Sequence, residues 1–147
     1  MIMLDKIKHS EFLDFFSKYS ELTKEPMFVV NSDYKVVYNN KTFENFVQKS
    51  NEDILGELFG NALNCMYITK GKNNCGNNYY CSLCNIRNTI TKSFNDVGYQ
   101  IKEEVVRDFK LNDEIIFRKL SLSSFSFKID NKIHVAIIIN DSDLVND

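Results

Sequence analysis

Apolar residues recur at intervals of three and four near the start of the chain, which is the spacing of one face of a helix. Ser10 is a suitable N-cap, and the segment must end before Pro26 because the residue before a proline avoids helical backbone angles. The pattern predicts an amphipathic helix of about four turns. Its apolar stripe is Phe12, Leu13, Phe15, Phe16, Tyr19 and Leu22.

The next segment alternates between β-prone runs and turn residues. Residues 27–30 and 35–38 are rich in valine and aromatic side chains, and the Asn-Ser-Asp-Tyr stretch between them is typical of a turn. The two runs therefore predict a β-hairpin. Asn39 and Asn40 can cap a short helix that follows, and another helical turn is expected near Ile54.

One long helix and three long strands are predicted for the second half of the chain. Residues 71–78 are Gly, Lys and Asn apart from Cys75, and they predict a loop. Apolar residues then repeat with helical spacing from Cys81 to about Val97, so Cys81 and Cys84 are expected on the first turn of that helix. The expected strands run from residue 99 to about 109, from 114 to 129, and from 132 to 140.

Two of these strands carry further information. Residues 133–139 are almost all apolar, which favours a central strand. In the strand before it, the apolar positions change phase across Ser123 and Ser124, from Leu120 and Leu122 to the alternating set that begins at Phe125. This change of phase predicts a β-bulge or bend.

Composition limits the possible functions. The chain has 147 residues, of which 44% are hydrophobic, enough to bury one good core in a single domain. Its formal net charge of -2 and the lack of a basic run disfavour nucleic acid as a partner. No stretch is apolar for the roughly eighteen residues that a membrane span needs. We therefore expect a cytoplasmic protein, in which thiols stay reduced.

All four cysteines lie in one short segment, at positions Cys65, Cys75, Cys81 and Cys84. The last two have the two-residue spacer that lets both sulfurs face one ion, and a helix N-terminus stabilises thiolates. The spacing of the first two is irregular, which is less typical of an all-cysteine zinc site than of an iron-sulfur cluster. The pattern favours a four-cysteine cluster site, of the 4Fe-4S kind, with zinc as the alternative metal.

The cysteines are also compatible with two roles that need no metal. Cys65 could be a small buried hydrophobic residue, with the remaining cysteines incidental, although Cys75 lies in a polar loop where burial gives no reason for a cysteine. Alternatively, a disulfide between Cys81 and Cys84, or between Cys65 and Cys75, could form a redox switch.

The order of elements and two motifs resemble PAS domains. Residues 28–43 contain an apolar strand, a polar turn and an asparagine three residues before an aromatic residue, as at the start of that family. Residues 60–65, followed by Cys75, Cys81 and Cys84, resemble a cysteine-bearing PAS subgroup of bacterial sensory proteins. The resemblance implies an α+β fold, in which an antiparallel sheet of about five strands has helices on one face. Residues 26–141 would form this domain, with the amphipathic helix in residues 1–25 and a tail in 142–147.

The resemblance also implies a sensory protein without an enzymatic reaction. The two histidines, His9 and His134, are expected to have structural or solvent-edge roles, because no partner for a catalytic base is evident. A redox, oxygen or metal sensor is therefore expected. An electron-transfer protein that uses the cluster, or a PAS domain with a structural zinc and a ligand elsewhere, remains an alternative.

The organic and haem cofactors of PAS proteins fit less well. Asn64 and Cys65 resemble the start of the flavin motif of light sensors, but the three residues that follow differ from it, and residues 85–94 lack an axial histidine for haem. A small organic ligand would need a pocket, and its expected lining is Met27, Met66, Tyr67, Phe125 and Phe127. The apolar stripe of the N-terminal helix could be covered by the sheet of its own domain or by a second copy in a homodimer. An unknown downstream signalling protein is the other expected partner.

Overall fold

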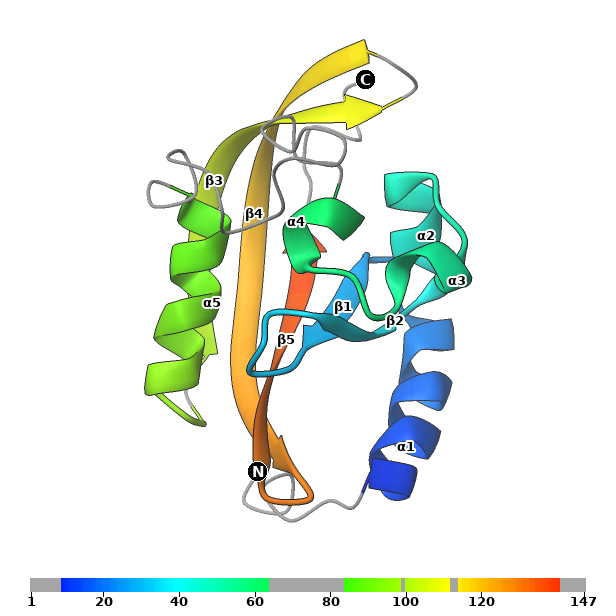
Figure 1. Ribbon diagram of the computed structural model, residues 1–147, viewed down its shortest axis with the longest axis vertical. Coiled ribbons are helices and arrows are strands. Elements are labelled where there is room, and N and C mark those ends of the chain that lie inside the picture. The colour runs from blue at the N-terminus through cyan, green and yellow to red at the C-terminus, as the bar shows by residue number, and fades with distance from the viewer. Residues whose placement is uncertain (1–8, 64–83, 99, 112–113, 141–147) are drawn as a thin grey trace.

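The computed structural model describes residues 9–63, 84–98, 100–111 and 114–140, and it contains one antiparallel sheet (Figure 1). Five strands form this sheet in the order β2-β1-β5-β4-β3, so the predicted α+β class is confirmed. The predicted hairpin is formed by β1 and β2, and β5 is central, as its apolar sequence predicts. The strands are β1 (Met27–Val30), β2 (Val36–Asn39), β3 (Gln100–Leu111), β4 (Glu114–Ile129) and β5 (Lys132–Asn140).

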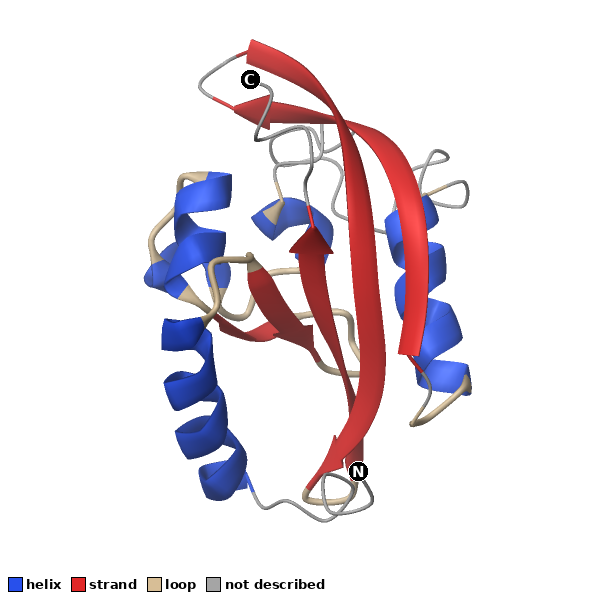
Figure 2. Ribbon diagram, turned by 180° about the vertical axis from the view of Figure 1, so that it is seen from behind, coloured by secondary structure: helices blue, strands red, loops and turns tan. Residues whose placement is uncertain are grey.

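Helices cover both faces of the sheet. Four of the described helices contribute to the larger core cluster, which joins them to one face; in Figure 2 the strands β3 to β5 lie in front of α4 and α5. These helices are α2 (Lys41–Val47), α3 (Asn51–Ile54), α4 (Phe59–Ala62) and α5 (Asn85–Asn95). The other face carries a smaller cluster that includes Phe16 of α1 (His9–Leu22). The core is therefore divided into two layers by the sheet.

The helix α1 packs on the sheet of its own chain. Phe16 is buried, and its ring meets the ring of Tyr38 edge-on, with 4.0 Å between the ring centroids. Tyr19 and Leu22 stay exposed, and Leu22 is 83% exposed. The sequence thus predicts the helix correctly, and its own domain covers part of its apolar stripe.

The predicted bulge in β4 is wrong. The register of β4 with β3 and with β5 continues without a shift across Ser123 and Ser124. Leu120 and Leu122 belong to the cluster beneath α2 to α5, whereas Phe127 belongs to the cluster beneath α1. The apparent change of phase arises because both faces of one regular strand are apolar along different parts of its length.

The free edge of β2 is covered by the chain that links α3 to α4. The N–H of Val36 donates to the carbonyl oxygen of Glu57 at 2.8 Å, and the N–H of Gly56 donates to that of Val36 at 2.8 Å. Gly56 has a φ of 85°, a conformation that glycine adopts without steric cost. This edge of the sheet is therefore closed by the chain itself. Among the described helices, none is long and apolar enough to cross a membrane.

Candidate functional site

Cys84 is the N-cap of α5. Its sulfur accepts a hydrogen bond from the backbone N–H of Arg87 at 3.4 Å, as the oxygen of a serine or aspartate cap would. The helix begins at Asn85, so Cys84 stands just before the first turn, whereas the sequence pattern predicts it within that turn. The side chain is 6% exposed and joins the core cluster on the helix side of the sheet. Its sulfur is thus fixed at the end of the helix where negative charge is favoured.

The other three predicted site residues, Cys65, Cys75 and Cys81, lie outside the described residues. Within the described ranges, no three His, Cys, Asp or Glu side chains come together in a group that could hold a metal. The four-cysteine site therefore stays a prediction, and Cys84 is its one member with a known position.

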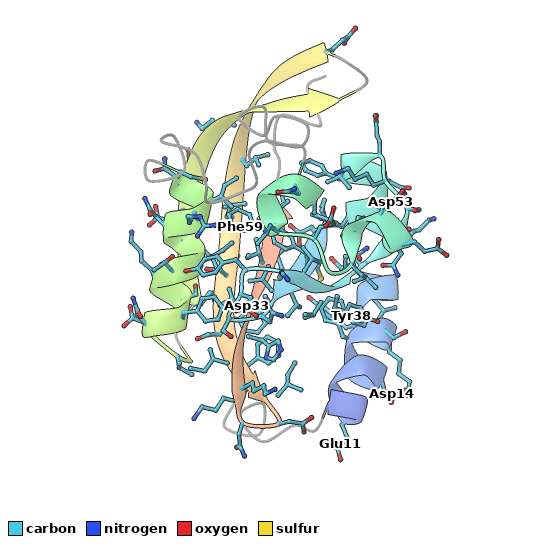
Figure 3. The ribbon with its side chains drawn as sticks, in the orientation of Figure 1. Glu11, Asp14, Asp33, Tyr38, Asp53 and Phe59 are labelled. Carbon is cyan, nitrogen blue, oxygen red and sulfur yellow. The ribbon has the colours of Figure 1, made fainter. Side chains whose placement is uncertain are left out.

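The cation of Arg87, in the first turn of α5, lies against two aromatic rings. The guanidinium carbon of Arg87 is 4.6 Å from the ring centroid of Tyr34 and 5.6 Å from that of Phe59, which is within the range of cation–π attraction. Phe59, labelled in Figure 3, comes from α4, and Tyr34 comes from the β1–β2 turn. The N-terminal part of α5 is thereby tied to two other elements.

Tyr34 reaches α5 in two further ways. Its hydroxyl lies 2.6 Å from the hydroxyl of Thr91, and its ring packs against Phe94 with centroids 5.5 Å apart. Its φ is 63°, which is unusual for a bulky residue. Such backbone strain persists only where surrounding contacts hold it in place. Sequence reasoning identifies the turn but misses this role, because the contacts of Tyr34 are with residues far along the chain.

Two buried serines join α5 to the sheet. The hydroxyls of Ser93 and Ser124 lie 2.6 Å apart, and both residues are buried. The hydroxyl of Ser126 accepts from the N–H of Gly98 at 3.2 Å, just after α5. Both contacts satisfy polar groups inside the domain, as burial requires. They fix the position of the helix that Cys84 caps.

The structure describes three of the five residues that are predicted to line a ligand pocket. Met27, Phe125 and Phe127 belong to the cluster under α1, where they pack as core. Met66 and Tyr67 lie outside the described residues. The three described residues therefore do not line a cavity between the sheet and α5.

His134 is buried on the α1 side of the sheet. Its Nδ1 lies 2.9 Å from the carbonyl oxygen of Lys132, and its ring stacks on Phe127 with centroids 6.3 Å apart. Beside it, a groove of about 330 Å³ runs between the β1–β2 and β4–β5 turns. Asp33, labelled in Figure 3, and Asp130 line this groove. The position fits a structural histidine; the side chain of His9 is outside the described part.

A partly buried lysine lies near the end of α4. Burial of the Lys49 side chain lowers its pKa, although Glu57 and Asp53 oppose the effect. Its Nζ donates to the carbonyl oxygen of Asn61 at 2.5 Å. This contact supplies a positive charge at the carboxyl end of α4, where the helix dipole favours one.

Comparison with known proteins shows the fold. No family model and no curated protein matches the chain, whereas many solved structures do. The PAS domain of a two-component sensor histidine kinase aligns with a TM-score of 0.57 and 9% identity, covering 92% of this chain and all of that one. The PAS domain of nitrogen regulation protein NR(II) from Vibrio parahaemolyticus aligns with a TM-score of 0.60 and 9% identity, over 85% and 95% of the two chains.

A light receptor has a similar fold. The blue-light photoreceptor Vivid aligns with a TM-score of 0.54 and 18% identity, covering 80% of this chain and 78% of that chain. At such low identity the similarity concerns the fold alone. The chain therefore has the fold of PAS domains, which is the fold that the sequence motifs predict.

Proposed function

We propose that this PAS-fold protein is a non-enzymatic cytoplasmic sensor of redox, oxygen or metal status. Its input site would comprise Cys65, Cys75, Cys81 and Cys84, holding an iron-sulfur cluster of the 4Fe-4S kind or, as the alternative, zinc. The observation that carries the proposal is the position of Cys84, whose sulfur accepts an N–H at the start of α5. Thiol sulfurs are the ligands that zinc and iron-sulfur clusters take, and this one is held in place at the start of a helix.

The donor set fits both metals. Four thiolates complete the coordination of a zinc ion or of a cubane cluster. A bound cluster would supply an electron donor and acceptor, whereas zinc would supply only a structural link. In either case Cys84 would anchor one corner of the site on a rigid helix, and the chain between Cys65 and Cys81 would bring the other ligands.

The chain around Cys84 offers a route from this site to the sheet. A change in the bonding of the Cys84 sulfur would change its acceptance of the Arg87 N–H and so loosen or tighten the start of α5. The helix meets the β1–β2 turn through Tyr34 and meets β4 through Ser93 and Ser124. The output would be an altered surface for a downstream signalling protein.

Anaerobic purification followed by metal analysis and a visible absorption spectrum tests the site. We expect a brown protein with bound iron and sulfide. A colourless protein with one zinc would exclude the cluster and support the zinc alternative. A metal-free protein whose thiols cross-link on oxidation would overturn metal ligation and support the disulfide switch.

Replacing Cys84 by Ser provides a sharp test of ligation. Serine is also a good N-cap, so α5 should keep its start while the site loses a soft ligand. We expect metal content to fall strongly in Cys84→Ser and in Cys75→Ser, with far-ultraviolet circular dichroism unchanged. The exposed neighbour Asn85, changed to Ser, is the matched control. Full loading of both cysteine variants would refute the four-ligand site.

Sensing is separated from simple electron transfer by comparing the two oxidation states. A sensor must differ in structure between them, since the signal can shift the partner equilibrium only through such a difference. We expect amide hydrogen exchange in α5 and the β1–β2 turn to differ between reduced and oxidised protein. Equal exchange in both states, with reversible reduction, would favour an electron carrier.

A further inference from the structure

The two edges of the sheet differ in whether another segment covers them. The segment between α3 and α4 covers β2, but β3 stands at the other end of the strand order with no strand beyond it in the described part of the chain. An open strand edge presents unpaired N–H and C=O groups to any strand of matching sequence. The residues of β3 whose exposure the structure gives include three exposed ones, Gln100, Lys102 and Glu104.

The same strand forms a two-stranded arm. The pairing of β4 with β5 ends where Ser121 meets Asn140, whereas the pairing of β4 with β3 continues to Glu114 and Leu111. Residues 105–111 and 114–120 therefore extend beyond the rest of the sheet as a hairpin, as Figure 1 shows. Two-stranded ribbons are marginally stable in water, and another strand beside the arm would support it.

From these features we propose that β3 pairs with β3 of a second copy of this chain, antiparallel and centred on Val105. In an edge strand, only every second residue directs its N–H and C=O groups outward. When two identical edges pair antiparallel, these outward-facing residues must meet one another. One residue of the strand therefore stands opposite the same residue of the second copy. With Val105 in that place, Glu103 stands opposite Arg107, and Lys102 stands opposite Asp108. These two pairs place opposite charges across from each other, whereas Glu104 stands opposite Val106 and Lys110 stands opposite Gln100. Ile101 stands opposite Phe109.

The neighbouring registers are unfavourable. A centre at Glu104, Glu103 or Arg107 places that charged residue opposite its own copy, and like charges directly opposite each other destabilise a sheet. A centre at Val106 places Lys102 opposite Lys110. Among the registers centred on residues 103 to 107, charge therefore favours the one centred on Val105, and this complementarity is the argument for a second copy as the occupant of the edge.

The pairing would build a continuous sheet across the two-fold axis, in the order β5-β4-β3-β3-β4-β5. Glu103 also contacts Lys92 of α5, with Nζ and Oε1 3.0 Å apart. The proposed register would place Arg107 of the second copy opposite this glutamate along the strand. The interface is separate from α1, which lies against the opposite end of the strand order.

Charge reversal with complementation tests the pairing. Lys102→Glu places a glutamate opposite Asp108, and Asp108→Lys places a lysine opposite Lys102, so each variant repels its own copy. A mixture of the two variants restores both pairs in a heterodimer. We expect sedimentation equilibrium of the reduced full-length chain to show a dimer. Each single variant should weaken this dimer by about tenfold or more, and the equimolar mixture should recover it.

Three results would overturn the proposal. A chain that remains monomeric at all concentrations has no such interface. A dimer that persists in both charge variants, or one that is lost in Leu22→Asp but kept in them, belongs to another surface, of which α1 is the foremost. Circular dichroism of every variant separates lost pairing from lost folding, and the double variant Lys102→Glu/Asp108→Lys, which restores both charge pairs within one chain, must dimerise again.

Discussion

Asn40 joins three backbone segments through one side chain. Its Oδ1 accepts from the N–H of Met27 at 3.0 Å and from that of Phe43 at 2.9 Å, and its Nδ2 donates to the carbonyl oxygen of Glu25 at 2.8 Å. The residue is 2% exposed, so its amide group is almost entirely buried. The asparagine of the PAS-like motif is thus a helix cap that also fixes the start of β1.

Removing this side chain should be costly. We predict that Asn40→Ala lowers the free energy of unfolding by about 2–4 kcal/mol, because the N–H groups of Met27 and Phe43 lose a buried acceptor and the carbonyl oxygen of Glu25 loses its donor. Urea denaturation followed by circular dichroism measures the effect. Asn45→Ala, at an exposed position of the same helix, is the control and should change it by no more than about 0.5 kcal/mol. A loss of stability in Asn40→Ala no larger than that in Asn45→Ala would mean that the cap contributes little to the free energy of unfolding.

The contact between the hydroxyls of Tyr34 and Thr91 is the second residue-scale prediction. Tyr34→Phe and Thr91→Val each remove one partner of the 2.6 Å contact and leave the ring and the helix in place. We predict that a double-mutant cycle gives a coupling free energy of about 1 kcal/mol. Additive losses would show that the turn and α5 do not communicate through this bond, and would weaken the proposed route from Cys84.

At the scale of elements, α1 is the part whose attachment is most readily tested. Phe16 is 4% exposed and packs on Tyr38, so we predict that Phe16→Ala lowers the free energy of unfolding by about 3–4 kcal/mol. Leu22→Ala, in the same helix but 83% exposed, should change it by no more than about 0.5 kcal/mol. Thermal and urea unfolding give both values. Similar small effects would show that α1 is not held by its own sheet.

The helices and strands also show how much of the fold can be predicted from the sequence. Hydrophobic periodicity predicts α1 and all five strands, because each apolar run lies in one element and on one sheet. It places the start of α5 a turn too early, since Cys84 caps the helix instead of joining it. Periodicity also misreads β4, because a strand with two covered faces loses the simple alternation from which one face is inferred.

Less of the candidate functional site than of the fold can be predicted from the sequence. Spacing identifies Cys84 as a candidate ligand, but not its role as a cap, which depends on where the helix begins. The packing of Arg87 against Tyr34 and Phe59 has no signal in the sequence, because these residues meet only when the turn, α4 and α5 are assembled. Contacts of this kind depend on tertiary structure and not on local pattern.

For the whole molecule, the sheet order predicts a gradient of local stability. The central strand β5 is paired on both sides, with β1 and β4, and its residues Val135 to Ile137 are buried beneath the two core clusters. In the arm, residues 114–120 of β4 pair only with β3. Opening the arm therefore breaks one ladder, whereas opening β5 requires unfolding most of the domain.

Amide hydrogen exchange should reveal this gradient. In a dilute sample, where the protein is monomeric, we predict that amides paired within β5 exchange slowest, with an opening free energy close to that of global unfolding, and that those of residues 105–111 and 114–120 exchange much faster. Raising the concentration until β3 pairs with its copy should slow exchange in residues 105–111 and leave β5 unchanged. An arm protected as strongly as β5 in the dilute sample would contradict the gradient, because support for the arm would then have to come from within the same chain.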